Sequence, residues 1–91
     1  MKAERQVTIL NQKGLHVRPA TKLAETAGQF SARIEVVKDD QIVNGKSSID
    51  LLTLAAEPGT HLLLRAEGTD AESAVKTLAE LILNRFGFRD D

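Results

Sequence analysis

The shortness of the chain restricts its fold more than any other feature. The chain has 91 residues and no cysteine, so it is about the size of one ordinary domain and has no disulfide to hold a smaller unit together. Hydrophobic residues make up 42% of the sequence, the usual share for a globular protein. We therefore expect residues 1–91 to fold as a single domain with one modest core. A core of this size cannot also enclose a large cofactor, so we expect no cofactor and place the chemistry at the surface.

The composition argues against several classes of function. Twelve Lys and Arg face 13 Asp and Glu, and the three aromatic residues are all Phe, whereas nucleic-acid binders usually show a basic excess and stacking aromatics. The first ten residues lack the apolar run of a signal peptide, and no stretch approaches the length of a membrane span. We expect a cytoplasmic protein that binds no nucleic acid and does not insert into membranes.

Hydrophobic patterns along the chain predict seven secondary-structure elements. Val7 and Ile9 alternate as in a strand, whereas Ala20, Leu23 and Ala27 follow helical spacing. The predicted elements are a strand at 6–10, a helix at 18–27, a hairpin over 32–43, a short helix that begins at Ser47, a strand at 62–66, and a long helix that begins at a Thr69-x-x-Glu72 capping box and extends to Phe86. This β-α-β-β-α-β-α order predicts an α+β fold in which helices cover one face of an antiparallel sheet.

The strongest candidate site lies at the start of the first predicted helix. His16 comes just before this helix, Gly14 leaves room for close backbone approach, and Arg18 adds a cation. Backbone amides and the positive end of the helix dipole converge there, which suits a phosphate. An imidazole in this place can accept a phosphoryl group, and a guanidinium suits the oxygens. The pattern leaves open a plainer interpretation, in which His16 only caps the helix and Arg18 is a solvated charge.

The second histidine receives no role. His61 falls at the start of a predicted strand, and it is far from His16 in the sequence, with no defined carboxylate partner for either. We therefore expect no metal site. A hydrolase that used both histidines would need them side by side, which the sequence does not show.

Two spaced motifs resemble one known family. The sequence GLHVRPA at residues 14–20 resembles the active-site signature of the HPr family, the histidine-containing phosphocarriers of the bacterial phosphotransferase system. The sequence NGKSSIDLLTL at residues 44–54 resembles the second signature of that family, around its regulatory serine. Residues 58–60 and 68–72 fall in register as well, so the likeness covers nearly the whole chain.

The resemblance implies a fold and a relay. The fold is a two-layer open-faced β-sandwich, a four-stranded antiparallel sheet of order 1-4-2-3 with three helices on one face. In the relay, Enzyme I is charged by phosphoenolpyruvate and phosphorylates Nδ1 of the histidine that matches His16, and the group then passes to an Enzyme IIA domain. Arg18 matches the family arginine. Such a protein is a monomeric, stoichiometric carrier rather than an enzyme, and it needs no metal of its own.

The second signature implies regulation and docking. Ser47 matches the regulatory serine, which an HPr serine kinase/phosphorylase modifies, and Ser48 is the alternative acceptor. Partner proteins are expected to dock around His16 on a surface that includes Thr21, Ile49 and Leu52. An alternative is a regulatory interaction module of the same fold, controlled at Ser47, that carries no phosphate on histidine. His16 and Arg18 favour transfer, because such a module does not need them.

The chain also departs from the family pattern. Ser48 replaces a long aliphatic residue and Asp50 replaces a glycine found in many sugar-type members, which makes the expected docking patch more polar. The tail from Phe86 to Asp91 resembles the nitrogen-type paralogue. Sugar transport and nitrogen-type regulation therefore both remain open at this point.

Overall fold

The computed structural model describes residues 1–89 and contains the predicted elements in the predicted order. Their bounds are β1 (Lys2–Thr8), α1 (Val17–Ala27), β2 (Arg33–Lys38), β3 (Gln41–Asn44), α2 (Ser48–Thr53), β4 (His61–Glu67), α3 (Ala71–Leu83) and a short 3₁₀ turn, η1 (Arg85–Gly87). The predicted extension of the long helix to Phe86 is wrong, because α3 ends at Leu83 and the turn η1, which was not predicted, follows it. Asp90 and Asp91, the end of the tail that resembles the nitrogen-type paralogue, lie outside the described residues.

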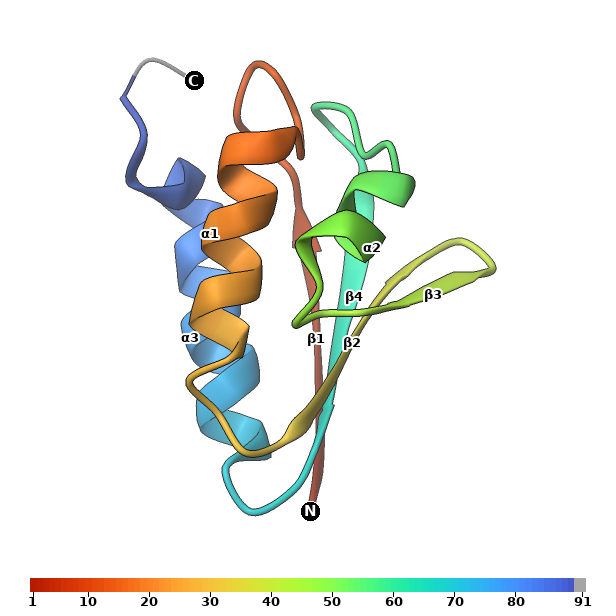
Figure 1. Cartoon of the computed structure of the whole chain (residues 1–91), viewed down its shortest axis with the longest axis vertical. Helices are drawn as coiled ribbons and strands as arrows, with labels where there is room; N and C mark the ends of the chain where they lie inside the picture. The colour runs from red at the N-terminus through yellow and green to blue at the C-terminus, as the bar shows by residue number, and fades with distance from the viewer. Residues whose placement is uncertain (90–91) are drawn as a thin grey trace.

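The four strands form one antiparallel sheet of order β1-β4-β2-β3. The pairing of β1 with β4 sets Lys2 opposite Glu67 and Thr8 opposite His61. All three α-helices lie on the same side of this sheet, with α1 between α2 and α3 (Figure 1). The two-layer open-faced sandwich expected from the sequence is therefore confirmed.

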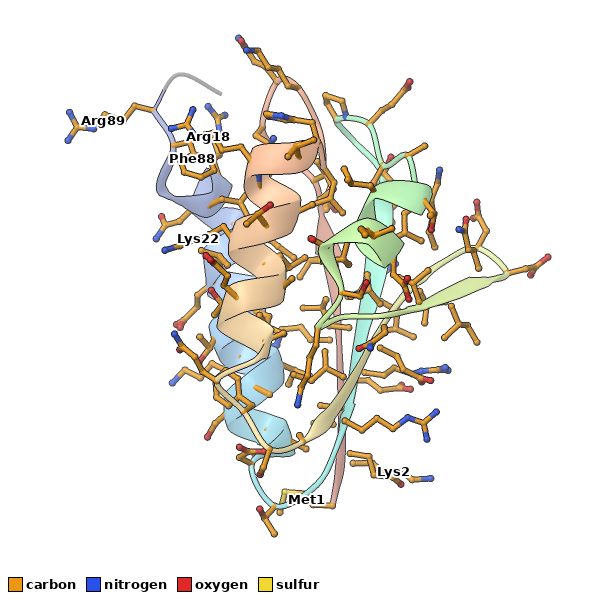
Figure 2. All side chains as sticks on the ribbon, in the orientation of Figure 1. Met1, Lys2, Arg18, Lys22, Phe88 and Arg89 are labelled. Atoms are coloured by element: carbon orange, nitrogen blue, oxygen red, sulfur yellow. The ribbon has the colours of Figure 1, made fainter. Side chains whose placement is uncertain are left out.

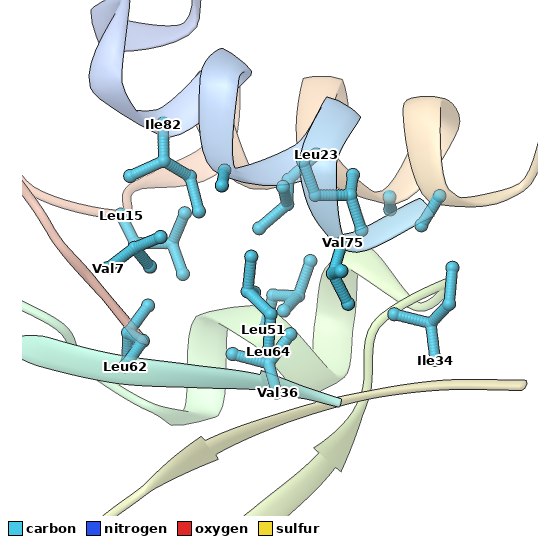
Figure 3. Packing of buried hydrophobic residues seen from close by; sticks show 14 of the residues in the cluster. Val7, Leu15, Leu23, Ile34, Val36, Leu51, Leu62, Leu64, Val75 and Ile82 are labelled. Carbon is cyan, nitrogen blue, oxygen red and sulfur yellow. The ribbon is translucent and has the colours of Figure 1, made fainter. Parts of the chain in front are cut away.

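The core lies between the helices and the sheet (Figure 3). Strand residues that alternate in the sequence, such as Ile34 and Val36, point into it from below, and helix residues such as Leu23 and Val75 enter from above. The apolar faces predicted from period 2 and period 3.6 are buried as predicted. The largest fully buried apolar side chains are Phe86, Ile9, Leu23, Ile34, Leu51, Leu54, Leu62, Leu64, Leu78, Ile82 and Val36.

The first strand starts earlier than predicted, at Lys2 rather than at Gln6, and ends at Thr8. The side chains of residues 4–6 are exposed, so the hydrophobic alternation that marks a strand is missing there. Backbone pairing with β4 extends the strand across this polar stretch. The side chains of such an edge strand do not alternate between apolar and polar along its whole length, so its full extent is difficult to predict from the sequence.

The predicted capping box at Thr69 and Glu72 is wrong. Asp70 is the N-cap residue of α3, and its side chain makes no capping hydrogen bond. Its carboxylate instead accepts hydrogen bonds from the backbone amides of Ser31 and Ala32, each 2.8 Å long. These bonds, that of Ser31 foremost, hold the pKa of the Asp70 carboxyl below its usual value although desolvation opposes them. Asp70 therefore tethers the loop between α1 and β2 to the start of α3.

Candidate functional site

The backbone that leads to His16 is held against the loop that precedes β4. Ile9 exchanges backbone hydrogen bonds with this loop, donating to Thr60 at 2.9 Å and accepting from Gly59 at 2.8 Å. Farther along, the Leu15 amide donates to the Ala56 carbonyl at 2.8 Å. Two loops that are far apart in the sequence therefore support each other at the end of the molecule where α1 begins (Figure 1).

Gly14 and Asn11 fix the last turn before His16. Gly14 has a φ of +68°, and a Cβ at this position would collide with the Ala56 carbonyl oxygen. The buried Asn11 side chain donates a hydrogen bond of 2.6 Å to the Gly14 carbonyl. Only glycine combines this backbone angle with so close an approach. The sequence analysis expected Gly14 to allow a close backbone approach, and the group that approaches it is the Ala56 carbonyl of the same protein.

His16 is the N-cap residue of α1, with an extended backbone at φ −88° and ψ −168°. Its carbonyl accepts the first helical hydrogen bond, from the Ala20 amide at 2.9 Å, but its half-buried side chain makes no capping hydrogen bond. His16 thus holds the cap position without using its ring for the task that N-cap side chains usually perform. The plainer interpretation is therefore right about the position of His16, which is the N-cap, while its side chain makes no capping hydrogen bond.

The first turn of α1 gathers positive charge beside this ring. It contains no acidic residue, so the helix dipole is not neutralised from within. Pro19 has no amide hydrogen, and Val17 and Arg18 belong to the first turn, whose amides precede the regular i→i−4 hydrogen bonds of the helix. An anion placed next to His16 would meet the positive end of the helix.

Arg18 is exposed but not merely a solvated charge. Its guanidinium carbon lies over the ring of Phe88, 3.9 Å from the ring centroid. Figure 2 shows the two side chains together at the start of α1, with Lys22 one turn farther along the same side of the helix. Nothing in the sequence pattern indicated Phe88 as a partner, because the turn η1 that returns the chain to α1 was not predicted.

Exposed apolar side chains lie on another flank of α1 and on α2. Arg18 and Lys22 lie on the side of α1 that faces α3 (Figure 2), and Val17 and Thr21 are each one position, about 100°, away around the helix. Ile49 is 74% exposed, Leu52 36% and Val17 64%. We call Val17, Thr21, Ile49 and Leu52 the α1–α2 surface. The sequence prediction named all of them except Val17, which the GLHVRPA motif contains.

Ser47 is the N-cap residue of α2, at the position where the sequence predicted the start of this helix. Its Oγ accepts a hydrogen bond of 3.2 Å from the Asp50 amide. The Asp50 carboxylate does not complete a reciprocal capping box, because it accepts a hydrogen bond of 3.4 Å from the Asn44 amide. Ser48 is the first residue of α2, and both serines are half-buried.

His61 belongs to the sheet. It begins β4, and its Nδ1 lies 2.9 Å from the Oγ1 of Thr8, the residue opposite it on β1. One ring nitrogen of His61 is therefore hydrogen-bonded to a residue of the neighbouring strand β1. Within residues 1–89, no cluster of three or more His, Asp or Glu side chains could hold a metal ion, and no helix is long and apolar enough to cross a membrane.

Comparisons with known proteins agree on one family. Residues 3–84 match the family model described as PTS HPr component phosphorylation site. The chain is 40% identical over 84 residues to the phosphocarrier protein HPr of Neisseria meningitidis serogroup A, covering 92% of this chain and 94% of the relative. It is also 40% identical over 85 residues to the phosphocarrier protein NPr of Shewanella violacea, covering 93% of each.

A solved structure gives the same result for the fold. HPr-C-His from Thermoanaerobacter tengcongensis superposes with a TM-score of 0.91 at 41% identity, covering 96% of this chain and 98% of that one. The similarity in sequence and in fold therefore covers nearly the full length of both chains. The chain belongs to the HPr family of phosphocarrier proteins of the phosphotransferase system.

Proposed function

We propose that this protein carries a phosphoryl group on His16, receiving it from phosphorylated Enzyme I in the cytoplasm and passing it to an Enzyme IIA domain. The observation that carries the proposal is the geometry at the start of α1. An imidazole holds the N-cap position of α1 without capping it, at the positive end of the helix and two residues before Arg18. Membership of the phosphocarrier family supports the same role.

The transfer step needs one nucleophilic atom and a set of donors for the oxygens. With the ring proton on Nε2, the lone pair of His16 Nδ1 attacks the phosphorus held by Enzyme I. The new N–P bond forms while the bond to the donor atom breaks, and that electron pair stays with the donor. The helix dipole and the Arg18 guanidinium stabilise the negative oxygens during transfer.

The second step reverses the roles. A nucleophile on the Enzyme IIA domain attacks the same phosphorus, and the N–P bond electrons return to His16. The protein leaves the cycle unchanged but turns over no substrate of its own, so it is a stoichiometric carrier and not an enzyme. The chain is 40% identical both to an HPr relative and to an NPr relative, so identity does not distinguish the sugar-type branch from the nitrogen-type branch. Transfer assays with sugar-type and nitrogen-type Enzyme IIA domains would distinguish them.

Labelling with Enzyme I tests the proposal. We expect incubation with Enzyme I and labelled phosphoenolpyruvate to give one acid-labile phosphate per protein, and phosphorus NMR to place it on Nδ1. His16→Ala should abolish the label. His61→Ala is the matched control and should keep it, because His61 lies on β4 and contacts Thr8. Labelling of His16→Ala, or its loss in His61→Ala, would overturn the assignment.

A further inference from the structure

We propose that Phe88 is a positioning residue for phosphoryl transfer, whose ring holds the Arg18 guanidinium at the N-terminal end of α1. This inference rests on the proposed role of His16 and adds a residue from the other end of the chain. The observation behind it is the contact of 3.9 Å between the guanidinium carbon and the ring centroid. A cation over the face of an aromatic ring is attracted by the negative charge of that face.

The backbone after α3 brings Phe88 to this place. Arg85, Phe86 and Gly87 have φ angles of +54°, +59° and +78°, so the chain leaves the helix in three successive left-handed residues. The Gly87 and Phe88 amides close the turn by donating to the Asn84 and Arg85 carbonyls at 3.0 and 3.1 Å. The chain thereby turns back toward α1 (Figure 1).

A buried anchor maintains this turn. Left-handed backbone is unfavourable for non-glycine residues such as Arg85 and Phe86, so it persists only where other contacts fix it. Phe86 supplies those contacts, because its side chain is 1% exposed and is part of the core. Phe88 follows two residues later and also packs against the edge of the core. Its ring is therefore a fixed platform rather than part of a loose tail.

The stacked geometry separates the ring contact of Arg18 from its hydrogen-bond donors. The ring occupies one face of the guanidinium, whereas the N–H donors lie in the guanidinium plane, where phosphoryl oxygens bind an arginine. A long arginine side chain loses conformational freedom when it binds an anion. Holding it over Phe88 beforehand reduces that loss at the moment of transfer.

The contribution of the ring face is separable from that of its bulk. Phe88→Leu keeps an apolar side chain but removes the aromatic face, and Phe88→Trp offers a stronger one. We expect Phe88→Leu to slow phosphorylation of His16 by Enzyme I by about two- to fivefold, the size of an exposed cation–π contact. Phe88→Trp should keep the parental rate or exceed it. A merely structural role would not favour tryptophan over leucine.

A double-mutant cycle with Arg18→Ala makes the test specific. In the Arg18→Ala background, Phe88→Leu should cause no further loss of rate, and in the parent protein the Arg18 side-chain protons should show an upfield ring-current shift that Phe88→Leu removes. If the parent protein is labelled but Phe88→Leu transfers at the parental rate, the positioning role is overturned and the proposed function stands. If the parent protein is not labelled on His16, the proposed function is overturned and the positioning role with it.

Discussion

Arg18 is exposed yet ordered, and this combination separates its effect on transfer from its effect on stability. We expect Arg18→Ala to slow phosphorylation of His16 roughly 10- to 100-fold, because a hydrogen bond to a charged group contributes about 1.5 to 3 kcal/mol. The melting temperature should fall by only a few degrees, since the lost contact with Phe88 is worth about 0.5 to 1 kcal/mol. Rapid-quench kinetics and thermal unfolding measure the two effects. A large fall in melting temperature with unchanged kinetics would contradict this role.

At the scale of single residues, the sequence predicted positions better than it predicted contacts. His16 and Arg18 could be recognised because helix starts and phosphate chemistry restrict residue types locally. The contact of Arg18 with Phe88 could not, since it depends on left-handed angles at Arg85 and Phe86 that sequence patterns do not indicate. Asp50 shows the same limit, because the hydrogen bond that its carboxylate accepts from the Asn44 amide joins α2 to β3 and leaves no local pattern in the sequence.

Among the elements, α2 is the one in which a single modification could change function without changing the fold. We propose that phosphorylation of Ser47, its N-cap, weakens docking at the α1–α2 surface. A negative charge at a helix start is stabilised by the dipole, so the helix should persist, while the same charge beside the exposed Ile49 disfavours docking of a partner on this apolar surface. We expect Ser47→Asp to keep the melting temperature of the parent protein and to slow phosphorylation of His16 by Enzyme I.

Ser47→Asn is the matched control, because asparagine caps a helix as well as aspartate does but carries no charge. Slow transfer in Ser47→Asp with parental transfer in Ser47→Asn identifies charge as the cause. Parental kinetics in both variants would leave Ser47 as a cap alone. Mass spectrometry after treatment with an HPr serine kinase would show whether Ser47 or Ser48 is the acceptor.

The α1–α2 surface has the composition of a transient interface, with an apolar centre next to polar groups. We expect Ile49→Ala and Leu52→Ala each to weaken binding of Enzyme I about fivefold, which corresponds to about 1 kcal/mol for a moderately important interface side chain. Titration of labelled protein with Enzyme I should shift the NMR signals of His16, Thr21 and their neighbours.

Leu83→Ala provides the control for this surface, because Leu83 is an equally apolar exposed side chain at the end of α3. Its binding should match that of the parent protein. Shifts that cluster along α3, together with a loss of affinity in Leu83→Ala, would move the docking site away from α1 and α2.

Helices and strands could be predicted where one face is buried, because burial produces a periodic pattern of apolar side chains. The face of α1 formed by Ala20, Leu23 and Ala27 is buried as its spacing predicted. By contrast, β1 extends to Lys2 through pairing alone, and the N-cap residue of α3 is Asp70 rather than Thr69. In both places a backbone partner from a distant part of the chain decided the outcome, and such partners leave no periodic pattern in the sequence.

Across the whole molecule, the candidate phosphorylation site and the Asp70 tether lie at opposite ends of the helices (Figure 1). One end holds His16, the start of α1 and the turn η1. The other holds the α1–β2 loop and the start of α3, joined through Asp70. The core fills the space between them. Stability and transfer should therefore respond separately to substitutions at the two ends.

Asp70→Asn tests this separation through the pH dependence of stability. The backbone amides of Ser31 and Ala32 lower the pKa of Asp70 in the folded protein, so the folded state binds fewer protons than the unfolded state in the acid range. The stabilisation is complete above the unfolded pKa of about 4 and is lost as the pH falls through the lower folded value. We expect Asp70→Asn to melt below the parent protein at neutral pH, and the difference to shrink as the pH falls below about 4. Asp40→Asn, which removes an exposed carboxylate in the β2–β3 turn, should leave the profile unchanged, and phosphorylation of His16 should stay at the parental rate in both variants. A difference in melting temperature that persists unchanged through the acid range would show that the Asp70 carboxylate charge does not stabilise the tether.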